Sequence, residues 1–169
     1  MRRAGETGPR SRAERGWLAG TDGKDLYVFR TIDGGISWEE SRTAVPKGLI
    51  NVQDLFFLDQ TRGWLITWHV NDGGTYLFST VNGGKSWAPE ANLSFQGKGN
   101  WAEIVRFIDE RRGFVFVEAP ERGLSYTTDG GAHWEKQAIR RFLGDCQVFE
   151  GDLLCSCGPG FGLLTVHPQ

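Results

Sequence analysis

The sequence lacks an apolar run of roughly 18 residues, the length that a membrane-spanning helix requires, so we expect a soluble chain. It contains one methionine and three histidines, and its formal net charge is only −2. A charge this small gives no general attraction to nucleic acid or to an anionic membrane surface. Neither nucleic acid nor a membrane is therefore expected among its partners.

Cysteine is scarce too, with only Cys146, Cys155 and Cys157 present. An odd number this small does not make a disulfide framework. Cys155 and Cys157 with the nearby His167 supply three ligands, whereas a closed zinc site uses four. We predict that the cysteines are buried in strands and that the protein holds no metal and no cofactor.

Residues 1–14 are basic, but no apolar stretch follows them, so they do not match a secretory signal. Their composition predicts a disordered or truncated N-terminal arm. The sequence does not identify the cellular compartment of the protein.

Glycine and large aromatic residues are abundant. The chain has 24 glycines in 169 residues, roughly twice the average usage, with seven tryptophans and eleven phenylalanines. Aromatic residues favour strands, and glycines favour the turns between them. The composition therefore indicates an all-β protein.

One eight-residue pattern occurs three times, at 31–38, 80–87 and 127–134. Each copy has the form Thr-x-Asp/Asn-Gly-Gly-x-x-Trp. Repeats at a period of this size indicate a modular all-β array, most often a propeller. A second landmark, Arg-Gly followed by an aromatic residue, begins at Arg15, Arg62 and Arg112.

The two landmarks divide the chain into units of four strand-like pieces separated by glycine and aspartate turns. We predict a partial β-propeller of four-stranded antiparallel blades, about three to three and a half in number, over residues 15–169. The expected units are 15–48, 49–98, 99–144 and an incomplete 145–169. The first unit lacks an opening apolar run, and the last ends before a glycine pair.

One segment has a competing pattern. Trp101, Ile104, Val105 and Ile108 follow a helical spacing. Residues 101–116 nevertheless align without a gap to residues 51–66, so a strand is the better prediction. The glycine-rich segment 158–162 resembles a phosphate loop, but Pro159 removes a donor N–H and no helix pattern follows, which favours a turn.

The repeated turns have a structural explanation. Glycine adopts positive φ at little cost, and the preceding Asp or Asn accepts hydrogen bonds from the turn. Asn82 stands where the other copies have Asp33 and Asp129, and an amide cannot act as a general acid. We therefore assign structural roles to Thr31, Asp33, Gly35, Trp38, Thr80, Asn82, Gly84, Trp87, Thr127, Asp129, Gly131 and Trp134.

The pattern resembles the Asp-box, or BNR repeat, of sialidases, sortilin-type receptors and related propellers. With the Arg-Gly-Trp element and the aligned Phe-Leu-Asp run, residues 15–140 resemble the photosystem II stability and assembly factor propellers. This resemblance implies a non-catalytic scaffold that binds a protein partner, and relatives of this kind are often exported. An open arc of blades also predicts self-association or missing blades, because free strand edges are sites of association.

The alternative is a carbohydrate-active propeller, either a sialidase-like glycoside hydrolase or a sugar-binding remnant. Such an enzyme needs an arginine cluster for a carboxylate, and Arg30, Arg62, Arg106 and Arg122 are candidates. The Phe-Arg-Ile-Pro element of these enzymes is absent, and half an array does not surround a pocket. We therefore expect no catalytic residues.

Departures from the repeat are the best clues to a binding surface, since repeated positions serve the fold. Aromatic and arginine side chains are enriched in interface hot spots. Packing variation and solvated turns are the simpler explanation of these positions. The candidate binding residues are Trp68, His69, Trp101, Arg106, Arg140 and Arg141.

Overall fold

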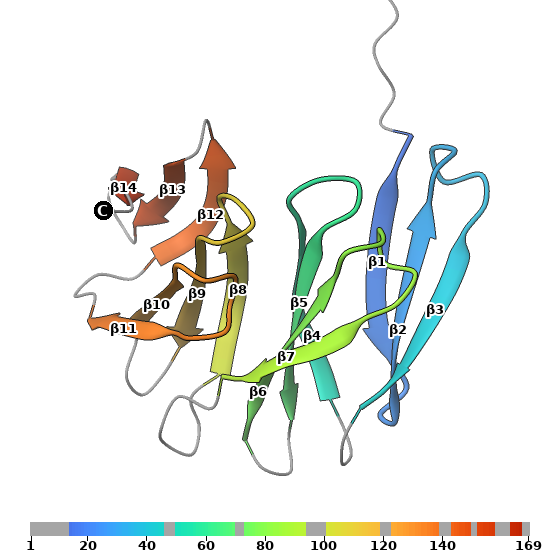
Figure 1. Cartoon of the computed structure of the whole chain (residues 1–169), viewed down its shortest axis with the longest axis horizontal. Helices are drawn as coiled ribbons and strands as arrows, with labels where there is room; N and C mark the ends of the chain where they lie inside the picture. The colour runs from blue at the N-terminus through green and yellow to red at the C-terminus, as the bar shows by residue number, and fades with distance from the viewer. Residues whose placement is uncertain are drawn as a thin grey trace, which may run out of the picture.

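The computed structural model describes residues 14–45, 50–69, 73–93, 101–118, 123–138, 143–149, 152–157 and 163–166. The strands in these ranges form four antiparallel sheets, which follow one another along the chain and stand side by side (Figure 1). None of the described residues belongs to a helix long and apolar enough to cross a membrane.

Sheets 1 and 2 come from the first half of the chain. Sheet 1 contains β1 (Gly16–Thr21), β2 (Asp25–Thr31) and β3 (Glu39–Ala44). Sheet 2 contains β4 (Ile50–Phe57), β5 (Gly63–His69), β6 (Thr75–Thr80) and β7 (Ala88–Asn92).

Sheets 3 and 4 come from the second half. Sheet 3 contains β8 (Trp101–Phe107), β9 (Gly113–Glu118), β10 (Gly123–Thr127) and β11 (Glu135–Ala138). Sheet 4 contains β12 (Leu143–Phe149), β13 (Asp152–Cys157) and β14 (Leu163–Val166).

Each sheet is a meander, because strands that are neighbours in sequence are hydrogen-bonded neighbours in space. The predicted all-β architecture of successive antiparallel sheets is confirmed. Among the described residues, sheet 1 has no counterpart of β4 or β8, and sheet 4 has no fourth strand. The cysteines lie in β12 and β13, as expected for strand cysteines, and their burial stays a prediction.

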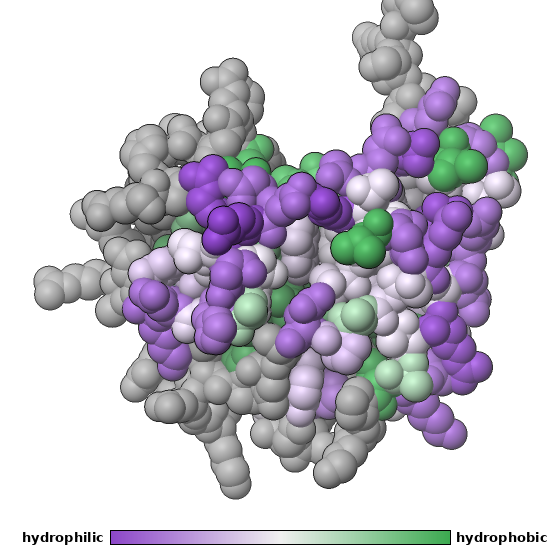
Figure 2. Space-filling view, in the orientation of Figure 1, coloured by the Kyte–Doolittle hydropathy of each residue, from purple (hydrophilic) through white to green (hydrophobic). Residues whose placement is uncertain are grey.

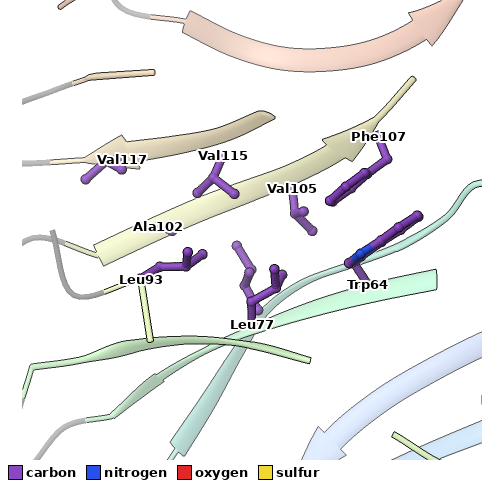
Figure 3. Packing of buried hydrophobic residues seen from close by; sticks show 9 residues of the cluster. Trp64, Leu77, Leu93, Ala102, Val105, Phe107, Val115 and Val117 are labelled. Atoms are coloured by element: carbon purple, nitrogen blue, oxygen red, sulfur yellow. The ribbon is translucent and has the colours of Figure 1, made fainter. Parts of the chain in front are cut away.

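The core lies between the sheets. Figure 3 shows the cluster between sheets 2 and 3, where Trp64, Leu77 and Leu93 pack against Val105 and Phe107. A second cluster joins sheets 1 and 2 in the same way. Sheets 1, 2 and 3 therefore bury apolar side chains against one another, and burial of this kind is the main favourable term in folding.

The segment with the helical spacing is a strand, β8, as predicted. A β-bulge between Ala102 and Ile104 explains the ambiguous pattern. A bulge adds one unpaired residue to a strand, so two inward-facing residues are separated by three positions instead of two. Ala102 and Val105 are both fully buried at that separation. The corresponding strand β4 has a bulge between Val52 and Asp54.

Residues 1–13 and 158–162 lie outside the described residues, so the expected N-terminal arm and the expected turn remain predictions.

Candidate functional site

The three repeated patterns, which we call the box turns, are the first candidate site because they contain acids. In the first box turn the Thr31 hydroxyl donates to Asp33 Oδ1 at 2.8 Å and accepts from the Gly35 N–H at 2.9 Å. The Ser37 N–H donates to Asp33 Oδ1 at 2.9 Å, and the Ser37 hydroxyl donates to Asp33 Oδ2 at 2.5 Å. Both carboxylate oxygens are therefore engaged inside the turn.

The second box turn makes the same bonds with an amide. The Thr80 hydroxyl donates to Asn82 Oδ1 at 2.9 Å and accepts from the Gly84 N–H at 3.0 Å. The Ser86 N–H donates to Asn82 Oδ1 at 3.0 Å, and Asn82 Nδ2 donates to the Ser86 hydroxyl at 2.8 Å. One acceptor oxygen, charged or neutral, is all that the turn geometry requires.

The third box turn repeats the arrangement with a histidine in place of serine. The Thr127 hydroxyl donates to Asp129 Oδ1 at 2.8 Å and accepts from the Gly131 N–H at 3.0 Å. The His133 N–H donates to Asp129 Oδ1 at 3.0 Å, and His133 Nδ1 lies 2.6 Å from Asp129 Oδ2. The imidazole thus bonds the oxygen that the Ser37 hydroxyl bonds in the first turn.

These bonds hold the acids in their ionised form. Bonds from the Ser37 hydroxyl, the Ser37 N–H and the Thr31 hydroxyl lower the pKa of Asp33 to about 2. The His133 N–H and side chain, followed by the Thr127 hydroxyl, hold the pKa of Asp129 well below its usual range. A carboxyl with so low a pKa has no proton to donate at neutral pH and is a weak base.

The glycine pair of the second box turn also contacts the preceding sheet. Gly83 and Gly84 have φ of 72° and 86°, which side chains rarely adopt. Trp17 Nε1 donates to the Gly83 carbonyl at 2.9 Å, and the Ser41 hydroxyl donates to the Gly84 carbonyl at 2.7 Å. Sheet 1 is therefore hydrogen-bonded directly to the box turn of sheet 2.

The Arg-Gly-aromatic element forms the rest of this contact. Trp17 stacks on Phe57 with ring centroids 3.9 Å apart, and Phe57 meets Trp87 edge-on at 5.9 Å. A Cβ placed on Gly63 would lie 2.7 Å from the Phe57 ring, so only glycine fits beneath it.

The next interface has the same three-ring arrangement. Trp64 and Phe107 lie face to face (Figure 3), with ring centroids 3.6 Å apart and ring planes 4° from parallel. Phe107 meets Trp134 edge-on with centroids 6.2 Å apart. A Cβ on Gly113 would lie 2.6 Å from the Phe107 ring. Each interface therefore places a phenyl ring between two indoles, over a glycine.

The arginines considered for a carboxylate site are dispersed and paired. Arg30 bonds Glu39 within sheet 1, and Arg62 bonds Glu110 of the next sheet. Arg122 lies outside the described residues. Each described member of the set thus binds a carboxylate of the protein itself.

The contacts of Arg106 explain why an arginine stands where the preceding repeat has the apolar Phe56. Its guanidinium bonds Asp54 Oδ2 at 2.5 Å, bonds the Val105 carbonyl at 2.6 Å and lies 5.5 Å from the centre of the Phe56 ring. The Arg106 and Asp54 side chains are both four-fifths buried. The same carboxylate accepts the Val105 N–H at 2.9 Å, so Arg106 belongs to a contact between sheets 2 and 3.

Of the other predicted binding residues, Trp68 and His69 lie in β5 and Trp101 lies in β8. His69 is fully buried, and its ring lies tilted against Tyr76 with the ring centroids 4.2 Å apart, so the surface role expected for it is wrong: its imidazole is out of a partner's reach. Trp68 is half-buried in β5, and Trp101 begins β8. Arg140 and Arg141 lie outside the described residues.

Sequence reasoning missed a group of exposed apolar side chains on the box turns. Ile32 and Val81 occupy the second position of their turns and are 52% and 74% exposed, and Ile36 is 84% exposed. The turns of sheets 1 and 2 lie at the same end of their sheets (Figure 1). We call Ile32, Ile36 and Val81 the box rim. The sequence signal for Ile32 and Val81 was an apolar residue between the box Thr and the box Asp or Asn, whereas Ile36 follows the glycine pair.

In Figure 2 the apolar areas are small and separate on a mostly polar face. A few isolated apolar residues are ordinary on a protein surface. The box rim is distinguished by its repetition on neighbouring turns, at ends of the sheets where loops commonly carry binding residues.

Two structures of YCF48 are among the solved structures that match this chain. The structure of YCF48 bound to D1 peptide matches with a TM-score of 0.61 and 18% identity, over 92% of this chain and 47% of that one. YCF48 from Cyanidioschyzon merolae matches with a TM-score of 0.60 and 17% identity, over 94% of this chain and 46% of that one. The fold is a partial β-propeller.

The propeller match confirms the resemblance in fold to the photosystem II assembly-factor propellers. The chain spans about half the length of the YCF48 chains that it matches. No family model and no curated protein matches this chain.

Proposed function

We propose that this chain is a non-catalytic propeller scaffold that binds a protein partner, of the kind used in complex assembly. Its fold is similar to that of YCF48, which has been solved bound to D1 peptide. Shared fold alone does not define a function. The proposal therefore depends on the chemistry of the box turns.

The observation that carries the non-catalytic role is the equivalence of Asn82 with Asp33 and Asp129. The three side chains make the same bonds through one oxygen to the box Thr and to the N–H four residues later. An amide supplies that acceptor but no proton transfer. What the three turns share is hydrogen bonding, so catalysis by these acids is not needed to explain them.

The box rim is the surface that we assign to the partner. Ile32, Ile36 and Val81 are exposed apolar side chains on two neighbouring turns that their own hydrogen bonds hold in place. A rigid presentation reduces the entropy lost on binding. Trp68, Trp101, Arg106, Arg140 and Arg141 remain proposed contributors, and the burial of His69 removes it from this set.

Titration calorimetry with the D1 peptide as probe tests the binding role. We expect saturable binding that Val81→Ser weakens at least fivefold. Lys85→Ser is the matched control, since Lys85 is an exposed residue of the same turn. Absence of binding, or equal loss in the two variants, would refute the assignment of this partner to this rim.

A fluorogenic sialoside tests the carbohydrate-active alternative. A sialidase site holds the substrate carboxylate with bidentate arginines, whereas Arg30, Arg62 and Arg106 each bind a carboxylate of the protein. We expect no turnover above background. Turnover that an Arg106→Met variant abolishes would overturn the non-catalytic assignment.

A further inference from the structure

The second box turn contains the one Asn-Gly pair in the sequence, Asn82–Gly83. An asparagine followed by glycine is chemically labile, because the glycine nitrogen can attack the side-chain amide and no Cβ on the glycine obstructs its approach. The first product is a five-membered succinimide ring, which water opens to aspartate or isoaspartate. The hydrogen bonds of the turn decide how far this reaction proceeds in the folded chain.

The side chain of Asn82 is presented as an electrophile. It is exposed to solvent, so water is at hand for hydrolysis. Its Oδ1 accepts the Thr80 hydroxyl at 2.9 Å and the Ser86 N–H at 3.0 Å, and its Nδ2 donates to the Ser86 hydroxyl at 2.8 Å. Two donors on one carbonyl oxygen stabilise the negative charge that develops there when a nucleophile attacks the carbon. The amide of Asn82 is therefore activated.

The nucleophile, the nitrogen of Gly83, is restrained instead. Gly83 is buried, and its N–H donates to the Thr61 carbonyl at 2.7 Å. A Cβ on Gly83 would lie 2.8 Å from the Gln60 carbonyl oxygen, so the loop between β4 and β5 fits closely over it. Trp17 Nε1 holds the Gly83 carbonyl at 2.9 Å. The nitrogen must leave its bond to Thr61 before it can lose its proton and turn towards Asn82 Cγ.

One carboxylate holds the covering loop in place. Asp59 Oδ1 accepts the Thr61 N–H at 2.6 Å, the Thr61 hydroxyl at 2.7 Å and the Arg62 N–H at 2.9 Å. These three bonds fix the Thr61 carbonyl against the Gly83 N–H. The strength of the Asp59 bonds therefore controls how often the nucleophile is released.

The turn also accepts one product of the reaction. Asp33 and Asp129 stand where the second turn has Asn82 and accept the same two bonds through Oδ1. In the first turn the Ser37 hydroxyl donates to the second carboxylate oxygen, and rotation of the Ser86 hydroxyl would supply this bond to an aspartate at position 82. Isoaspartate does not fit, because it adds a methylene group to the backbone beside Gly83.

We propose that Asn82–Gly83 is a deamidation site whose reaction is controlled by opening of the β4–β5 loop. After opening, the Gly83 N–H gives its proton to a base from solvent and the nitrogen bonds to Asn82 Cγ. The Cγ–Nδ2 bond then breaks, and Nδ2 takes up a proton and leaves as ammonia. One water opens the ring: cleavage between Cγ and the Gly83 nitrogen leaves aspartate, and cleavage at the backbone carbonyl leaves isoaspartate.

Deamidation to aspartate would give the second turn the form of the first and third turns. It adds one negative charge beside Val81 of the box rim and leaves the hydrogen bonds of the turn in place. The reaction needs no partner protein, no oxidant and no reductant. It is therefore independent of the binding role proposed for the box rim, and its test does not use the D1 peptide.

Peptide mapping by mass spectrometry follows the replacement of NH2 by OH in the full chain at mildly alkaline pH. The reference is the same chain in guanidinium chloride. We expect Asn82 to deamidate in both samples, at least tenfold more slowly in the folded chain. Asn51 and Asn92 precede valine and leucine and should remain amides, so they serve as internal controls.

Asp59→Ala tests the control by the loop, since it alters neither reacting residue. We expect the rate at Asn82 to rise at least fivefold in the folded variant. Asp109→Ala is the matched control. Asp109 Oδ1 holds the equivalent loop before β9 through two N–H groups at 2.8 and 2.7 Å, but that loop covers Gly130 instead of Gly83. This variant should change the rate at Asn82 less than twofold.

Hydrogen exchange of the Gly83 amide gives a second readout on the unaltered chain. Below the unfolding transition, concentrations of guanidinium chloride that raise this exchange rate should raise the deamidation rate in proportion, since both need the same local opening. This comparison decides the question even where Asp59→Ala fails to fold. The Asn82→Asp variant should keep the Tm of the original chain.

Four results would overturn the proposal. They are equal rates in the folded and denatured chain, equal acceleration by Asp59→Ala and Asp109→Ala, a constant deamidation rate while Gly83 exchange rises, and an Asn82 amide that survives in guanidinium chloride. A lower Tm for Asn82→Asp would show that the turn does not accept the aspartate product.

Discussion

Replacing Gly63 by alanine tests the three-ring interface directly. The added Cβ would lie 2.7, 2.8 and 2.9 Å from three atoms of the Phe57 ring. The ring cannot simply withdraw, because Trp17 stacks on it at 3.9 Å and Trp87 meets it edge-on at 5.9 Å. The strain must therefore spread into the contact between sheets 1 and 2.

Overpacking of a well-packed core costs about 1–3 kcal/mol. Three contacts below 3 Å on a confined ring place Gly63→Ala in the upper half of that range, about 2–3 kcal/mol. For a protein of this size, a loss of about 2 kcal/mol corresponds to a fall in Tm of roughly 4–8 °C. Urea denaturation and a thermal melt followed by circular dichroism measure both quantities.

Two further variants separate the ring contact from other effects of glycine. Gly20→Ala lies on a strand with open space around it and should change the free energy of unfolding by about 0.5 kcal/mol or less. Phe57→Ala should cost about 3–5 kcal/mol, and in that background Gly63→Ala should add almost nothing, since the obstructing ring is gone. Equal effects of Gly63→Ala and Gly20→Ala, or full additivity with Phe57→Ala, would refute the packing explanation.

Three other outcomes follow from the contacts of the acidic residues. Asp33→Asn should leave the Tm nearly unchanged and Asp33→Ala should lower it, because Asn82 already makes the bonds as an amide; equal melts would contradict this. Carboxyl NMR should find the Asp33 pKa near 2. Because this pKa lies below the value of about 3.8 in the unfolded chain, the stabilisation by ionised Asp33 is present above pH 3.8 and is lost as the pH falls towards 2. A titration midpoint near 4 would exclude these bonds. Asp54→Ala should cost about 2 kcal/mol in urea denaturation, since Arg106 and the Val105 N–H lose their acceptor, and a neutral result would argue against the contact between sheets 2 and 3.

The existence and order of the strands could be predicted from the repeats. The ungapped alignment of residues 51–66 with residues 101–116 outweighed the helical spacing around Val105. The bulge that produces this spacing could not be read from one copy, since a strand with one extra residue has the same pattern as a helical turn. The aligned copy at residues 51–66 identified the segment as a strand.

The contacts between sheets could not be predicted from the sequence. Arg106 stood out because it replaces an apolar residue, but its partner Asp54 lies on another strand, and the offset between two sheets is not set by either repeat alone. The same limit applies to Trp38. Its pattern matches that of Trp87, but its exposure depends on what covers the sheet to which it belongs. Local turn chemistry was readable because all of its partners lie within a few residues.

The stacking of Trp17 on Phe57, repeated by Trp64 on Phe107, gives the array a polarity. Sheets 1 and 2 each offer an indole ring to the next sheet, and sheets 2 and 3 each receive that indole with a phenyl ring. A gene duplication that adds one whole unit with both rings creates an indole–phenyl contact at each of its two borders without further mutation. Propellers whose sheets meet through such ring contacts can gain or lose blades during evolution while the remaining contacts keep the same pairs of rings.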